Sequence, residues 1–279
     1  MENLARVGAA SWGFRELALE ERLVICKRLG VKYLEAGIAN APTDIPLEAD
    51  GMELEKVKRL YLKYGISSAL ASTGNDFTLS DQKELKMQVE KVKKVIDICA
   101  EINAGYLRIF AGFSPAEEIT GKRWDNMISS ITEVAEYARR KKVILAIETH
   151  GGVISYPDGV VHFSSVTTAK ECLKRMLSEI PEDVKFVFDP ANLYAVELAQ
   201  PEEIYQILKG RIAYFHMKDF IKKQNGHYVP AACGESDFDW KALMRIISDS
   251  SEPVLVEYEN CWDVEAGMAR SLQYLENIG

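Results

Sequence analysis

The sequence predicts an α/β fold, a single-domain (β/α)8 TIM barrel over residues 1–279. Two observations lead to this prediction. Short apolar runs alternate eight times with amphipathic helical patterns, and the first element of the series is a strand. No linker rich in Pro, Gly or Ser and no shift of composition divides the 279 residues, a length that one barrel can fill.

Eight segments have the β-branched and aromatic residues of buried strands, and each is followed by a loop and a helical pattern. They are residues 6–11, 31–36, 66–71, 105–110, 143–148, 184–189, 212–217 and 253–258. A doubly wound open sheet is the alternative architecture. The first strand-to-helix turn, "GAASWGFRE", lacks the G-x-G-x-x-G fingerprint of a dinucleotide-binding sheet, so the barrel is favoured.

The helical pattern is clearest at residues 84–102. Val89, Val92, Ile96 and Cys99 recur there every three or four residues, and lysines cover the opposite face. Residues 52–64 repeat the spacing, and further helices are expected over 124–141, 166–180 and 262–278. Each helix has one apolar stripe, as expected for a layer that packs around a barrel.

The composition bears on partners and location. A net charge of −8 disfavours nucleic acid, whose phosphates are held by basic surfaces. The opening stretch "MENLARVGAASWGF" does not read as a signal peptide, and no apolar run is long enough to span a membrane. Five cysteines without a framework spacing indicate a reducing compartment. We therefore expect a cytoplasmic protein with no membrane or nucleic-acid partner.

Four consecutive strands in the second half of the chain end in potential metal ligands: Glu148 in "LAIETHGG", Asp189 in "FVFDPAN", His216 in "YFHMKDF" and Glu257 in "VLVEYEN". The carboxyl ends of barrel strands converge on one face, so these side chains are expected to meet. Three carboxylates and one imidazole suit Mn²⁺, Co²⁺ or Mg²⁺, with Zn²⁺ also possible. The alternative is that strand ends are polar only because they meet water.

The same strand ends resemble a known family. "E-x-H-G" at 148–151, "F-D-P-x-N" at 188–192, "H-x-K-D" at 216–219, "G-E-S-D-F-D-W" at 234–240 and "V-E-Y-E" at 256–259 are similar to motifs of the xylose isomerase-like barrel superfamily. The resemblance is to its sugar-phosphate isomerase/epimerase branch, with ketose 3-epimerases, hydroxypyruvate isomerases and inosose dehydratases. It covers nearly the whole chain and also implies a (β/α)8 barrel.

The resemblance implies that Glu148, Asp189, His216 and Glu257 bind one divalent metal ion, and that Glu148 and Glu257 are also the catalytic acid/base pair. A metal that bridges a ketose carbonyl and its neighbouring hydroxyl stabilises a cis-enediolate. One glutamate then removes the proton and the other returns it. Glu259 is the alternative fourth ligand, because it lies on the same side of the strand as Glu257.

Six further residues are substrate-binding candidates, each with a structural alternative. Strand periodicity points His150 and Lys218 toward the site, and Trp12 would form an apolar wall. Glu35 resembles a substrate-side glutamate of the family, and Arg108 would hold a hydroxyl or phosphate unless it pairs with a buried carboxylate. Asn192 stands where many family members have histidine. It still hydrogen-bonds a hydroxyl but carries no charge, which leaves the substrate open.

The leading interpretation is a metal-dependent isomerase or epimerase of a sugar or sugar phosphate. A dehydratase of the inosose type is an alternative on the same site. Two readings from other classes are a DNA-repair enzyme like endonuclease IV, disfavoured by only four histidines, and a non-catalytic sugar- or metal-binding barrel. The reacting carbon, the phosphorylation of the sugar and the native metal stay open. The family often forms dimers or tetramers, so a homodimer or homotetramer is expected.

Overall fold

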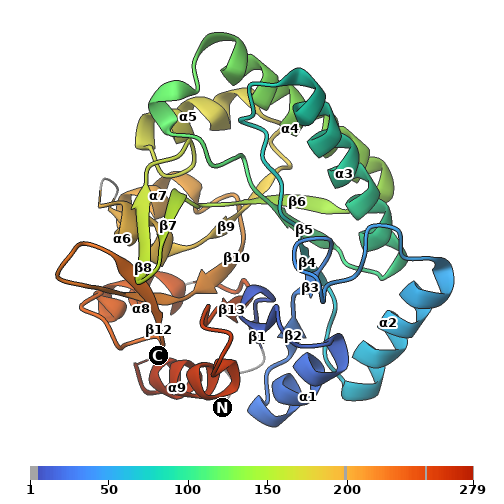
Figure 1. The fold of residues 1–279 in the computed structure, drawn as a ribbon, viewed down its shortest axis with the longest axis vertical. Coiled ribbons are helices and arrows are strands. Elements are labelled where there is room, and N and C mark those ends of the chain that lie inside the picture. The colour runs from blue at the N-terminus through green and yellow to red at the C-terminus, as the bar shows by residue number, and fades with distance from the viewer. Residues whose placement is uncertain (1–5, 198–199, 249, 279) are drawn as a thin grey trace.

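Eight parallel strand positions form a ring in the computed structural model, which describes residues 6–197, 200–248 and 250–278 (Figure 1). Around the ring they are β1 (Val7–Ala9), β2 (Tyr33–Leu34) with β3 (Ala36–Gly37), β4 (Leu70–Ser72), β5 (Tyr106–Ile109), β6 (Ile144–Glu148), β9 (Lys185–Phe188), β10 (Ile212–Met217) and β13 (Val254–Val256). The pairing of β13 with β1 joins the end of the series to its start. The predicted barrel is confirmed.

The second strand position is interrupted at Glu35. Its first half, β2, pairs with β1, and its second half, β3, pairs with β4. The backbone N–H of Glu35 still donates to the carbonyl of Ala9 at 2.9 Å. The ring therefore closes through a broken strand, and the prediction of one continuous strand over 31–36 was wrong at this residue.

Helices surround the ring on its outer side (Figure 1). They are α1 (Leu19–Leu29), α2 (Gly51–Tyr64), α3 (Gln82–Glu101), α4 (Gly121–Lys141), α5 (Lys170–Glu179), α7 (Pro201–Leu208), α8 (Trp240–Ser248) and α9 (Val264–Ile278), with the short α6 (Pro190–Val196) directly after β9. The helix predicted from residue 166 begins only at Lys170. The Thr168 hydroxyl accepts from the backbone N–H of Ser165 at 2.9 Å, which favours a turn before the helix.

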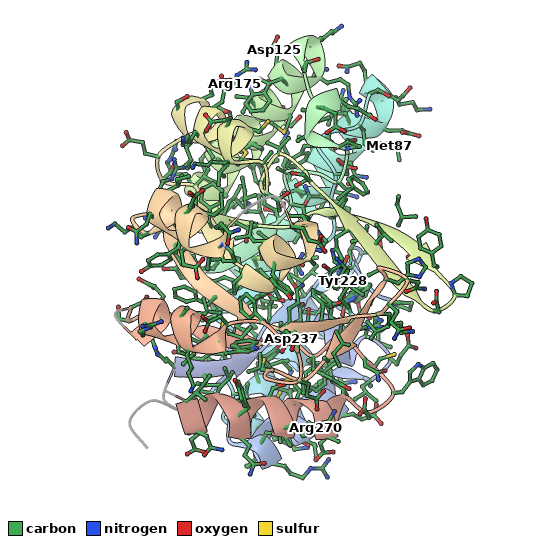
Figure 2. The ribbon with its side chains drawn as sticks, turned by 90° about the vertical axis from the view of Figure 1, so that its left-hand side faces the viewer. Met87, Asp125, Arg175, Tyr228, Asp237 and Arg270 are labelled. Carbon is green, nitrogen blue, oxygen red and sulfur yellow. The ribbon has the colours of Figure 1, made fainter. Side chains whose placement is uncertain are left out.

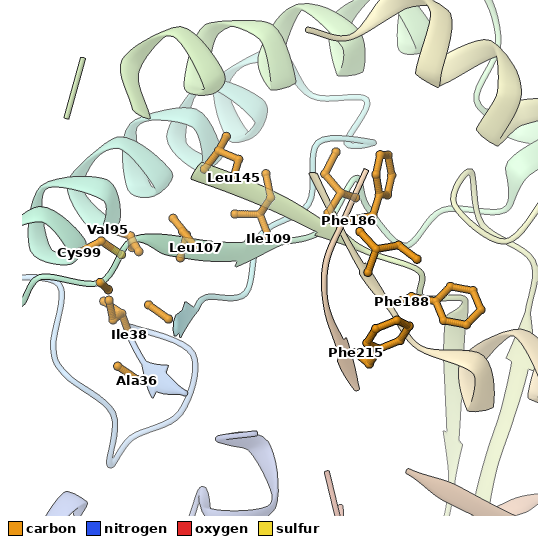
Figure 3. Packing of buried hydrophobic residues seen from close by; sticks show 14 of the residues in the cluster. Ala36, Ile38, Val95, Cys99, Leu107, Ile109, Leu145, Phe186, Phe188 and Phe215 are labelled. Carbon is orange, nitrogen blue, oxygen red and sulfur yellow. The ribbon is translucent and has the colours of Figure 1, made fainter. Parts of the chain in front are cut away.

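The barrel strands bury both faces. Leu107, Ile109, Leu145, Phe186 and Phe215 point outward and pack in the main core that also includes helix residues (Figure 3). The alternate positions point into the barrel, where a second cluster contains Ala10, Leu70, Ala146, Val187, Ala213, Tyr214 and Leu255. Because side chains alternate along a strand, the residue two positions after an interior one also faces the barrel axis. This period places polar strand ends over the apolar interior.

A four-stranded antiparallel sheet, the cap sheet, was not predicted. Its strands are β7 (Gly152–Tyr156), β8 (Gly159–Phe163), β11 (Asp219–Lys222) and β12 (Tyr228–Ala231), in the order β11-β12-β8-β7. Figure 2 shows it projecting from one side of the barrel, with Tyr228 labelled. The turn signals were present in the sequence, as "PDG" at 157–159 and "NG" at 225–226. The cap sheet therefore comes from two insertions, one after β6 and one after β10.

Two further findings concern the chain as a whole. Within the described ranges, the helices contain no stretch that is long and apolar enough to cross a membrane. The five cysteines are all free. Cys26, Cys99 and Cys233 are buried, whereas Cys172 and Cys261 are partly exposed.

Candidate active site

The four predicted metal ligands meet at the carboxyl ends of their strands. Glu148 is the last residue of β6, His216 lies within β10, and Glu257 directly follows β13. Asp189 follows β9 and caps α6 by accepting from the backbone N–H of Asn192 at 3.0 Å. One ligand atom from each of the four lies within 4.8 Å of the others, and all four residues are buried.

Several buried polar atoms in this group have no hydrogen-bond partner. Both ring nitrogens of His216 are unpaired, and its Nδ1 lies 3.5 Å from Glu148 Oε1 and 3.6 Å from Glu257 Oε2. Asp189 Oδ2 also makes no hydrogen bond, and its contact is an ion pair with Lys218 Nζ at 3.1 Å. A buried polar group without a partner costs about 1–3 kcal/mol. A divalent cation with oxygen and nitrogen ligands would satisfy one ring nitrogen of His216 and Asp189 Oδ2, so the residues present fit the metal.

The charges around the group also fit a cation. Among the described residues, five carboxylates lie together with three groups that carry positive charge when protonated: Glu35, Glu148, Asp189, Glu257 and Glu259 against Arg108, His216 and Lys218. With all five carboxylates ionised and the imidazole protonated, negative charge is in excess by two. Buried charges are costly unless they are compensated, and a divalent ion supplies the charge that is needed.

Lys218 supplies part of the compensation. Its Nζ lies 2.8 Å from Glu257 Oε2, 2.9 Å from Glu259 Oε1 and 3.1 Å from Asp189 Oδ2. Burial works against the charged ammonium, but these carboxylates outweigh it and raise the pKa of Lys218 well above its usual value. The predicted inward direction of Lys218 is therefore correct, and its partners are carboxylates proposed as metal ligands.

The ligand carboxylates have divergent acidities. Burial works against ionisation of Glu148, but His216 and Arg108 outweigh it and lower the pKa of Glu148 to about 2. For Glu257 burial is likewise outweighed, by Lys218 and His216, and its pKa lies well below the usual value. Burial raises the pKa of Asp189 to about 7 despite the nearby Lys218. An additional positive charge beside Asp189 would lower that pKa.

A cavity of about 730 Å³ opens above the group. Of the predicted site residues, Trp12, Arg108, Glu148, His150, Lys218 and Glu257 line it. The cap sheet contributes Val153, Ser155, Val160 and Pro230 to the wall. The volume lies in the range of small-molecule sites, and the wall combines apolar side chains with a few polar groups.

Glu35 and Asn192 are not among the lining residues and instead hold other site groups. The Tyr214 hydroxyl donates to Glu35 Oε1 at 2.9 Å, and His216 Nε2 lies 3.5 Å from the same oxygen. Asn192 Nδ2 donates to Glu148 Oε1 at 3.2 Å. Their contact with substrate stays a prediction. The sequence pattern did not single out Tyr214, although it lies two residues before His216 and so faces the same way.

Arg108 and His150 have different surroundings. Arg108 Nε lies 3.2 Å from Glu148 Oε2, so the structural alternative of a buried ion pair is present, while the residue also reaches the cavity. The His150 ring packs edge-on against Phe110 and Phe113, at 5.2 and 5.5 Å between ring centroids. Burial lowers the pKa of His150, so a neutral imidazole faces the cavity.

These features define a barrel with a buried group of three carboxylates and one imidazole, whose donor atoms fit a cation, at the carboxyl ends of its strands. Residues 23–278 match the family model described as "Xylose isomerase-like TIM barrel", and the chain belongs to this family. The resemblance inferred from the strand-end motifs is thereby confirmed.

The curated relatives include fructoselysine 3-epimerase from Shigella flexneri, which is 22% identical over 250 residues, covering 88% of this chain and 86% of the relative. Among solved structures, the probable 3-DHS dehydratase of petrobactin synthesis from Bacillus anthracis has a TM-score of 0.77 at 14% identity, covering 98% of this chain and 100% of the other. A xylose isomerase-like barrel from Mycobacterium smegmatis in complex with magnesium has a TM-score of 0.71 at 14% identity, covering 99% and 97%.

Proposed function

We propose that the protein is an isomerase or epimerase that acts on a sugar and depends on a divalent metal ion. The observation that carries this proposal is the buried group Glu148, Asp189, His216 and Glu257, with its two glutamates open to a cavity of sugar size. The family and the epimerase activity named for its relative support it. The sugar is the partner, and dimerisation or tetramerisation and a cytoplasmic location stay predictions.

Glu148, Asp189, His216 and Glu257 would hold the metal. A divalent ion held there would act as a Lewis acid on a carbonyl and its neighbouring hydroxyl, and would acidify the C–H bond of the carbon that carries this hydroxyl. Mn²⁺, Co²⁺ and Mg²⁺ match the oxygen-rich ligands best, and Zn²⁺ is compatible. The magnesium in the related barrel is in accord with this choice.

Glu148 and Glu257 are proposed to move the proton. Both line the cavity, and both approach the same nitrogen of His216 from different strands. One carboxylate takes the proton from carbon, which leaves an enediolate in the substrate, and the other carboxyl group returns a proton. Delivery to the opposite face of the same carbon gives an epimer, and delivery to the neighbouring carbon gives an isomer.

The remaining side chains orient the substrate and the acid/base pair. Arg108 and Asn192 hold Glu148 from two sides, at 3.2 Å each, and Lys218 holds Glu257 at 2.8 Å. Fixing a general base in this way raises the rate because less motion is needed to reach the reacting geometry. Trp12 and the cap sheet line the cavity, and their apolar side chains would limit the access of water to the bound sugar.

Solvent-deuterium incorporation tests the proposal. Metal-stripped protein and protein resupplied with Mn²⁺, Co²⁺ or Mg²⁺ are incubated in D₂O with free and phosphorylated ketoses and inososes. We expect incorporation next to the carbonyl only with metal, and a loss of at least about a hundredfold in Glu257→Gln. Glu265→Gln, in a surface ion pair with Arg28, is the matched control and should behave like wild type.

The label and the product separate the alternatives. Deuterium at a carbon with inverted configuration identifies an epimerase, and transfer between neighbouring carbons identifies an isomerase. Release of water in place of reprotonation would assign the dehydratase reaction. Tight metal binding without exchange on any substrate would contradict the proposed catalysis and favour a binding protein.

A further inference from the structure

Two positively charged side chains line the cavity without a carboxylate partner. Arg15 Nη1 donates to the carbonyls of Trp12 and Glu259, at 3.0 and 2.8 Å, and Lys91 Nζ donates to the carbonyl of Gly74 at 2.7 Å. Within the described part of the chain, no carboxylate oxygen lies within 4.0 Å of either group. They differ in this respect from the two cations beside the proposed metal ligands, which are both in ion pairs.

The loop between β3 and α2 links the two cations to one edge of the cavity. The Thr43 hydroxyl in this loop donates to the carbonyl of Arg15 at 2.5 Å. Asn40 lies against Gly74, where a Cβ atom would be only 2.2 Å from Asn40 Oδ1, and the Gly74 carbonyl is the one that Lys91 contacts. Arg15, in the loop after β1, and Lys91, on α3, therefore flank the same loop in the first half of the barrel.

Both groups are held in position before any ligand binds. The guanidinium of Arg15 lies 4.8 Å from the centroid of the Trp12 ring, which fixes its plane, and its other nitrogens stay free to donate. Lys91 is partly buried, and this burial lowers its pKa, since the attraction of Asp44 offsets the desolvation of the ammonium only in part. An anionic ligand would supply the missing compensation.

Two carboxylates in this region, Asp44 and Asp76, do not fill that role. Asp44 acts on Lys91 only from beyond ion-pair distance, and its Oδ1 is paired with Arg22 at 2.9 Å. Asp76 lines the same cavity, but its Oδ1 accepts from both the backbone N–H and the hydroxyl of Thr78, at 2.7 and 2.6 Å. No ion pair involves it among the described residues. The two cationic side chains at this edge of the cavity, Arg15 and Lys91, therefore remain available to bind an anion.

We propose that Arg15 and Lys91 form an anion subsite that binds a phosphate or carboxylate group of the substrate. The inference rests on the proposed function and narrows its substrate class to anionic sugars. A planar guanidinium matches the oxygens of either anion in a two-pronged contact, and the ammonium adds a point charge. The sugar carbons would then extend from the subsite toward Glu148 and Glu257 in the same cavity.

Matched ligand pairs test the subsite. Binding of ribulose phosphate and ribulose, and of fructuronate and fructose, is measured by calorimetry on the metal-loaded protein. We expect the anionic member of at least one pair to bind at least about tenfold more tightly than its neutral partner. Arg15→Gln and Lys91→Met should each lower the affinity for the anionic ligand about tenfold and leave the affinity for the neutral sugar unchanged. Lys94→Met, on the exposed side of the same helix, is the control.

The outcomes distinguish this inference from the proposed function. Preference for the phosphate or for the carboxylate pair identifies which anion the subsite takes. Equal affinity within both pairs, no binding of either anionic ligand, or an equal loss for charged and neutral ligands in the variants would overturn the subsite. Preferential binding without deuterium exchange would leave the subsite standing and contradict the proposed catalysis. Deuterium exchange on neutral sugars alone would support the proposed catalysis and contradict the anion subsite.

Discussion

At the scale of single residues, Lys218 has an unusual position. Its ammonium contacts two of the four proposed metal ligands, Asp189 and Glu257, and also Glu259. A divalent ion bound to the same carboxylates would repel it, since like charges a few ångströms apart interact strongly in a buried site. Lys218 therefore stabilises the metal-free group and competes with the metal.

Replacing Lys218 by Met tests this competition. The metal-free variant should be less stable than wild type by about 3 kcal/mol, because buried carboxylates lose their partner. Its affinity for Mn²⁺ should rise at least about tenfold, because no ammonium has to move. Urea unfolding and calorimetric titration measure the two effects. Lys222→Met, which removes an exposed pair with Glu197, should change neither, and weaker metal binding in Lys218→Met would show that the lysine assists the metal.

The four proposed ligands were accessible from the sequence, because each one closes an apolar run and strand alternation fixes the direction of its side chain. The same rule gave the direction of Lys218 but not its partners. Arg15 and Lys91 lie in a loop and on a helix, where no period of two applies. Their place at one edge of the cavity depends on tertiary contacts between separate segments, such as that of Thr43 with Arg15. Such contacts cannot be read from the sequence pattern.

At the scale of elements, the cap sheet contains a histidine in an apolar environment. His162 pairs with Val153 across β7 and β8, and its ring packs 5.1 Å from Phe220 and 5.5 Å from Tyr228. Neither ring nitrogen has a hydrogen-bond partner. Burial, with smaller contributions from His150 and Lys218, lowers the pKa of His162 to about 3.

This shift predicts a pH dependence of stability. Between its ordinary pKa of 6.5 and about 3, the unfolded chain binds a proton at His162 that the folded chain does not. Stability from this residue is complete above the ordinary pKa and is lost as the pH falls. Between pH 7 and 5, wild type should lose about 2 kcal/mol more than His162→Phe.

Urea unfolding at the two pH values measures the difference. Tyr156→Phe, in the neighbouring strand, keeps His162 and should follow wild type. The same pH dependence in wild type and in His162→Phe would mean that His162 titrates alike in the folded and unfolded chains.

The elements themselves were predictable to different degrees. The eight ring strands followed from short apolar runs, and their ends moved by a few residues, as at β4, which begins at Leu70 in place of residue 66. The break at Glu35 depends on how the strand pairs on its two sides, and that information lies in other strands. The cap sheet escaped prediction because its hairpins are separated by more than fifty residues, although each had a visible turn signal.

At the scale of the whole molecule, metal binding should be linked to folding. The proposed ligands come from β6, β9, β10 and β13, so one ion would connect four strands of the ring. At a free Mn²⁺ concentration a hundred times the dissociation constant, the stability should rise by about 2.7 kcal/mol, or about 5 °C in Tm. Melting curves with Mn²⁺ and with a chelator measure the shift.

Asp189→Asn removes one ligand charge and keeps the shape of the side chain, so it should abolish most of the shift. A wild-type melting temperature that does not respond to Mn²⁺, Co²⁺, Mg²⁺ or Zn²⁺ would contradict a metal site at this position.

The ligand group lies on four consecutive strand positions, β6 to β13, which are one half of the ring. Arg15 and Lys91 come from the other half of the chain and face the same cavity. The residues proposed for proton transfer and those proposed to recognise the anionic end of the substrate are thus encoded in separate stretches of the gene. Substitutions in the first half of the chain can therefore change which substrates bind while the residues proposed to transfer the proton stay the same. New substrate specificities can evolve in this barrel by that route.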